Sequence, residues 1–135
     1  MTPETQSTAG VILLAVTAVE FGGVSLLRFL SSRTAGYVDN PVRRALFQAG
    51  HAHAGVLVIF ALLGLLYLDA AVLGAGTRAL VQTCLVAAPI LMPLGFFLSV
   101  ANPRAERPNR LIALVYVGAA ALAVGVVTLG VNLLA

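Results

Sequence analysis

The sequence predicts an all-α integral membrane protein, a bundle of four transmembrane helices formed by residues 1–135 as a single domain. Three observations predict it, and the first two concern composition: 60% of the residues are hydrophobic, with a mean hydropathy of +1.01, and only 10% of the residues are charged. Soluble domains carry about 25% charged residues. A chain of this size could not cover a core with so little polar surface, so the composition nearly excludes a soluble domain.

The third observation is the set of apolar stretches. Each holds about 20 or more residues, which at about 1.5 Å of helical rise per residue crosses about 30 Å of hydrocarbon. The predicted spans are residues 8–30, 45–68, 79–101 and 111–135. The N-terminal sequence MTPETQST has no basic residue, which a signal peptide requires, so we expect the first span to be retained.

The arginines predict the orientation of these spans. Seven of the eight basic residues flank the first and third connections, and they are Arg28, Arg33, Arg43, Arg44, Arg104, Arg107 and Arg110. The positive-inside rule places these connections in the cytoplasm and both termini outside. We expect a multi-pass protein of the bacterial cytoplasmic membrane, with the lipid bilayer as its surroundings. The net charge of +3 is then a topology signal and does not predict nucleic-acid binding.

Local signals refine two of the helices. Asn40 followed by Pro41 is a typical helix start, so the second helix should begin near Pro41, before the bilayer. Pro89 and Pro93 lie inside the third span, where each removes a backbone donor, and predict a helix kink. The fourth span carries a stripe of small residues that includes Gly118 and serves an internal contact or a homodimer equally well.

Ionisable and polar residues inside the spans are the candidate site. Glu20, an acidic residue in mid-span, is costly there and therefore a functional candidate. His51 lies seven residues after Arg44, and Glu20 lies eight residues before Arg28, so both should lie at similar depth. The predicted supporting polar network at about this level consists of Gln48, Met92 and Tyr116.

The two histidines of the chain, His51 and His53, should point to nearly opposite sides of their helix. Residues two apart are separated by about 200° around an α-helix, so on a regular helix they cannot chelate one ion. We expect His51 to face the bundle interior and Glu20. His53 should face another helix or another protomer, where Gly50 and Gly64 allow close approach.

The segment HAHAGVLVIFALLGLLY resembles the histidine-bearing helix of haem-copper oxidase catalytic subunits, and of small four-span relatives such as the NnrS-type membrane proteins. The whole chain resembles an uncharacterised bacterial family of short four-span proteins with a Gly-His-Ala-His-Ala-Gly core. The oxidase resemblance implies that His51 or His53 is an axial haem ligand or a copper ligand. With only two histidines, a bis-histidine haem would require two haems, or one histidine from each of two protomers.

Three functions remain open. The first is a redox or metal-handling membrane protein that binds haem or a transition metal through His51 and His53, with Glu20 as a ligand or charge compensator. The second is an oligomeric proton-coupled channel or carrier for a small solute that uses a Glu20–His51 relay. The third is an accessory subunit of a larger membrane complex. A homodimer or other homo-oligomer fits the first two, and whether the chain is an enzyme is left open.

Overall fold

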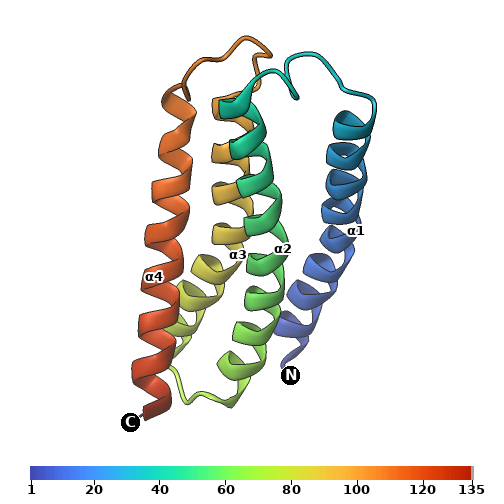
Figure 1. The fold of residues 1–135 in the computed structure, drawn as a ribbon. Helices are drawn as coiled ribbons and strands as arrows, with labels where there is room; N and C mark the ends of the chain where they lie inside the picture. Colours follow the sequence, from blue (N-terminus) through green and yellow to red (C-terminus); the bar gives the residue numbers. More distant parts are fainter. Residues whose placement is uncertain (135) are drawn as a thin grey trace.

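The computed structural model describes residues 1–134, and these form four long helices joined by short connections (Figure 1). Their bounds are α1 (Pro3–Ser31), α2 (Pro41–Ala70), α3 (Ala75–Ser99) and α4 (Ala113–Leu134), with a short 3₁₀ turn, η1 (Arg110–Ile112), leading into α4. All four are long and apolar enough to cross a membrane. The prediction of an all-helical chain with four helices long and apolar enough to span a membrane is confirmed for this part of the chain. Ala135, the last residue of the fourth predicted span, lies outside the described residues.

Helix starts follow capping side chains. The predicted start of the second helix is confirmed: Asn40 accepts a hydrogen bond from the backbone N–H of Arg43 at 3.0 Å, and Pro41 is the first helical residue. Thr2 caps α1 in the same way, so this helix begins at Pro3, five residues before the apolar span begins. The helix begins before the predicted span because its capping residue lies in polar sequence, which a search for apolar stretches does not detect.

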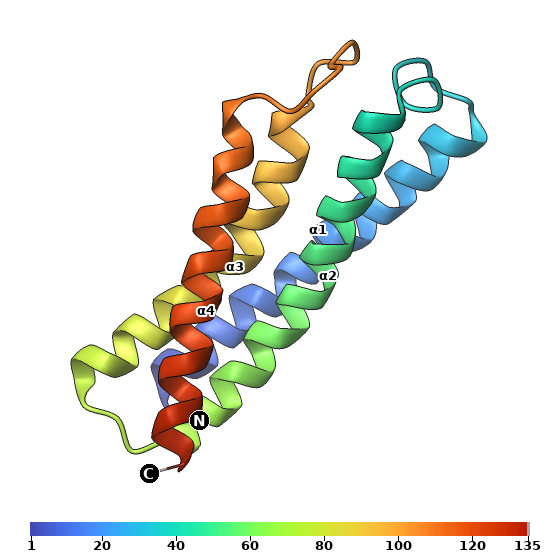
Figure 2. The ribbon, with the colours of Figure 1, turned by 60° about the vertical axis from the view of Figure 1, so that its left-hand side comes forward.

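The helices form two antiparallel pairs, α1 with α2 and α3 with α4, joined mainly by contact between α2 and α3 (Figures 1 and 2). Helix α1 packs chiefly on α2, and α2 touches α4 only slightly. The core lies where α2 and α3 meet, and its most buried members are Ala61, Leu65, Leu68, Val81, Leu85 and Ala88. The outer sides of α1 and α4 are therefore largely uncovered by the rest of the chain.

Glycines bring α3 and α4 together. A β-carbon on Gly95 would lie 2.7 Å from the backbone nitrogen of Val115, and one on Gly118 would lie 3.0 Å from the backbone nitrogen of Met92. Side chains at these positions would separate the two backbones. The small-residue stripe of the fourth helix thus makes an internal contact at Gly118.

Helix α3 bends partway along its length (Figure 2). Pro89 and Pro93 both lie inside it, and the helix continues through them from Ala75 to Ser99. A proline ring clashes with the carbonyl four residues earlier and lacks the N–H that would bond it. The carbonyls of Leu85 and Pro89 therefore lose their usual helical donors, which accounts for the bend.

Candidate functional site

The ring of His51 lies against α1 at a pair of glycines. A β-carbon on Gly23 would lie 3.0 Å from Nε2 of His51, and one on Gly22 would lie 3.5 Å from Nδ1. The absence of side chains at these two positions gives the imidazole its space. One helical turn further along α2, Gly55 faces Val19. Sequence reasoning did not assign Gly22 and Gly23 a role, although two adjacent glycines in a span can mark close approach.

His53 faces the other neighbour of α2. Its ring centroid lies 5.0 Å from that of Phe96 in α3, and its Nδ1 lies 2.8 Å from the carbonyl oxygen of Ala49. A carbonyl oxygen only accepts, so Nδ1 carries the proton. In the neutral ring Nε2 then keeps a free lone pair. The expectation that His53 faces another helix agrees with this placement.

Glu20 lies on an exposed part of α1, meaning that the rest of the chain does not cover it. In residues 1–134 its carboxylate takes part in none of the side-chain hydrogen bonds or ion pairs, including any with His51. Glu20 precedes Gly23 by three residues, so it projects about 60° around α1 from the glycine that His51 covers. The structure places Glu20 and His51 at neighbouring levels. The imidazole contacts Gly22 and Gly23 and not the carboxylate of Glu20.

The other predicted site residues lie apart from one another. Gln48 is exposed one turn before His51, and Tyr116 is 71% exposed on α4. Met92 is buried and packs against Gly118 of α4. A hydrogen-bonded network linking these three to the histidines is not formed within the described residues.

A metal site with several protein donors is not assembled inside one copy. Among residues 1–134, no group of three or more His, Cys, Asp or Glu side chains is placed to hold a metal ion. His51 and His53 face different helices, so each side of α2 presents a single imidazole. A set of three or more protein donors at either histidine would need side chains from outside this copy of the chain.

A polar cluster that sequence reasoning missed lies at the end of the bundle opposite the arginine-rich connections. Asp69 accepts hydrogen bonds from the backbone N–H of Thr2 and the hydroxyl of Thr5, each at 3.0 Å, and forms an ion pair with Arg78. Arg78 also donates to the carbonyl of Leu68 at 2.9 Å. Thr5 is fully buried. The sequence signal was Arg78 itself, the one arginine on this side, together with an aspartate at the end of the second span.

This cluster ties the ends of α1, α2 and α3 together. Its donors and acceptors satisfy one another, and no buried side-chain nitrogen or oxygen in the described part of the chain lacks a partner. The cluster therefore has a structural role, and none of its polar groups is left free to bind a ligand.

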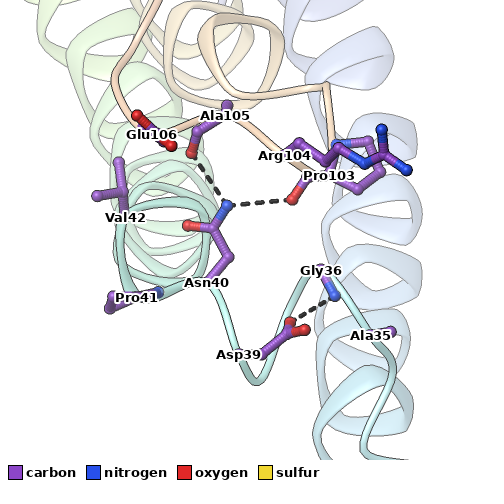
Figure 3. A pocket seen from close by; sticks show the side chains of 10 residues that line it. All are labelled: Ala35, Gly36, Asp39, Asn40, Pro41, Val42, Pro103, Arg104, Ala105 and Glu106. Carbon is purple, nitrogen blue, oxygen red and sulfur yellow. Dashed lines mark hydrogen bonds between the residues drawn. The ribbon is translucent and has the colours of Figure 1, made fainter.

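An open hollow of about 770 Å³ lies between the first and third connections (Figure 3). Figure 3 shows Asn40 donating to the carbonyls of Pro103 and Ala105, at 3.1 and 3.0 Å, and Asp39 accepting from the N–H of Gly36. The two Asn40 bonds hold the first and third connections together, whereas the Asp39 bond lies within the first connection. The hollow is formed by the packing of the connections, and the Asp39 and Asn40 side chains that line it bond to backbone groups of these connections.

Comparison with protein-family models, with curated proteins and with solved structures gave no match.

Proposed function

We propose that the chain is a small integral membrane protein that holds a transition-metal ion or haem through His53, in a redox or metal-handling role. The observation behind this is the hydrogen bond between Nδ1 of His53 and the carbonyl of Ala49. Histidines that ligate metals almost always donate their other ring N–H to a carbonyl or carboxylate, which fixes the tautomer. His53 has this arrangement, and the lone pair of its Nε2 is free to bind a metal ion.

His51 is the weaker candidate. Its ring is seated on Gly22 and Gly23, and no hydrogen bond of the described residues orients it. It can supply a second, separate imidazole on the opposite side of α2. The resemblance of this helix to the histidine-bearing helix of haem-copper oxidases also favours the ligand function.

The test is the absorption spectrum of the detergent-purified protein, oxidised and then reduced with dithionite, together with its metal content by mass spectrometry. A Soret band with redox-shifted α and β bands establishes haem, whereas a stoichiometric metal without these bands establishes a metal ion. His53→Ala should lose most of the bound group, and His51→Ala, the matched control on the other side of α2, should keep more of it. Unchanged content in both variants would contradict the proposal.

A second function, an oligomeric proton-coupled channel or carrier, is favoured by one observation. Glu20 is an ionisable group inside a span, exposed on α1, with two imidazoles at neighbouring levels. Intramembrane Glu and His side chains form the proton relays of pumps and transporters. Proton flux through proteoliposomes that Glu20→Gln abolishes, in protein free of metal and haem, would select this function over the first.

A further inference from the structure

We infer that the chain assembles with further copies of itself through a contact in which Glu20 of one copy faces His53 of the next. The inference deepens the proposed function, because it rests on His53 as the ligand and places the second donor of that site on another copy.

Glu20 and His53 lie at the same level. Helices α1 and α2 are antiparallel, and His51 lies opposite Gly22 and Gly23 while Gly55 lies opposite Val19. His53, halfway between His51 and Gly55, is therefore level with residues 20 and 21 of α1. Copies of one chain inserted in the same direction share their depths, so Glu20 of one copy can meet His53 of another without either moving along the membrane normal.

Within one copy the two cannot meet. The side of α2 that contacts α1 carries His51, whereas His53 is on the side that contacts Phe96 of α3. Glu20 lies on α1, the helix that packs against the His51 side of α2, and it is exposed. The carboxylate and the free Nε2 thus belong to two different faces of the molecule, which a head-to-tail contact between copies brings together.

The chemistry of the two groups favours this contact. A carboxylate facing hydrocarbon is costly, and intramembrane ionisable residues are almost always found facing protein or water. His53 offers an imidazole whose Nδ1 is already bonded to Ala49, so Nε2 is the atom available to the carboxyl group. A protonated carboxyl can donate to Nε2, or a carboxylate can accept from the imidazolium. Either form is neutral overall and suits a membrane interior.

With a metal ion in place of the shared proton, the same pair defines the kind of metal that the proposed site would take. An imidazole nitrogen and a carboxylate oxygen suit divalent first-row ions such as Zn²⁺, Fe²⁺ or Cu²⁺, whereas Cu⁺ favours thiolate and thioether donors. A head-to-tail contact repeats from copy to copy, so it closes into a ring when the rotation permits. Each contact would then hold one Glu20–His53 pair.

Cysteine cross-linking tests the contact. In a Cys84→Ser background, a chain with Glu20→Cys and a differently tagged chain with His53→Cys are co-expressed, and the membranes are oxidised. We expect a disulfide-linked heterodimer. Phe21→Cys paired with His53→Cys is the matched control, because Phe21 is level with Glu20, is 76% exposed, and points about 100° away around α1. It should cross-link at least several-fold less.

The outcomes separate the inference from its alternatives. No heterodimer, or equal yields from Glu20→Cys and Phe21→Cys, would overturn it, as would cross-linking of Glu20→Cys chains to one another alone. A charge-swap experiment is the second arm, read as oligomer mass by native mass spectrometry. Glu20→His and His53→Glu should each lower the mass, and the double variant should restore it; failure of the double variant, with helicity retained, would contradict the contact.

The two proposals can fail separately. Cross-linking of Glu20→Cys to His53→Cys chains, together with wild-type protein that carries neither a stoichiometric metal nor haem, would uphold the contact while the metal or haem function falls. Metal content that depends on His53 but not on Glu20, without the cross-link, would uphold the function and overturn the contact.

Discussion

The imidazole of His51 lies directly over Gly23, where a β-carbon would come within 3.0 Å of Nε2 and 3.1 Å of Cε1. The contact joins α1 to α2 in mid-span, and α1 has no other extensive neighbour. The packing of these two helices therefore depends on a glycine and a histidine that lie far apart in the sequence.

Gly23→Ala should be less stable than Gly10→Ala by about 1 kcal/mol or more, because its added methyl group would lie 3.0 Å from the His51 ring, which must give way. Thermal or denaturant unfolding in detergent measures it. Gly10→Ala is the matched control on the same helix, since a β-carbon there meets nothing within 4 Å. It should be neutral or stabilising by up to about 1 kcal/mol. Equal effects of both substitutions would contradict the close packing of His51 on α1.

Asp69→Asn should destabilise the protein by about 1–3 kcal/mol, because hydrogen bonds to a charged group are lost and Arg78 loses its counter-charge. The side chains of Asp69 and Arg78 are 12% and 21% exposed, so water replaces the pair poorly. Glu4→Gln, an exposed carboxylate at the same end, should change stability by less than about 0.5 kcal/mol. A double-mutant cycle with Arg78→Gln should show coupling, and strict additivity would argue against the ion pair.

Asn40 has two separable roles. Asn40→Ala removes the cap of α2 and the bonds to the third connection, and should cost about 1–2 kcal/mol. Asn40→Asp keeps an acceptor for the N–H of Arg43 but loses the donors to the carbonyls of Pro103 and Ala105, so it should cost less. Unfolding midpoints of the two variants give the comparison. A loss in Asn40→Asp as large as that in Asn40→Ala would show that the bonds between the connections matter more than the cap.

The orientation predicted from the arginines is testable by labelling. In a Cys84→Ser background, Gly74→Cys lies in the second connection, where a β-carbon meets nothing within 4 Å, and Glu106→Cys lies in the third. A membrane-impermeant maleimide should label Gly74→Cys in intact cells and Glu106→Cys only after permeabilisation. The reverse pattern would place both termini in the cytoplasm.

Much of the site was foreseeable from residue type and helical phase. Glu20, His51 and His53 stand out because ionisable groups are rare in apolar spans, and the separation of the histidines follows from a step of two residues on an α-helix. Helical phase also predicted that His51 lies on the side of its helix that faces the first helix. It did not show that Gly22 and Gly23 would receive the ring, because an interhelical contact depends on how two helices rotate against each other.

The sequence by itself determined the four helices, the start of α2 at Asn40 and Pro41, and the bend expected in α3. These depend on local hydrogen bonding, on proline geometry and on apolar length, all of which are properties of short segments. Only the tertiary structure decided that Asp69 meets Arg78 and Thr5, that Met92 fills the space at Gly118, and that Glu20 stays uncovered. Those outcomes depend on which helix faces pack together. In a nearly uniform apolar sequence, the packing of helix faces is specified by glycine positions and side-chain shape and not by a polar–apolar pattern.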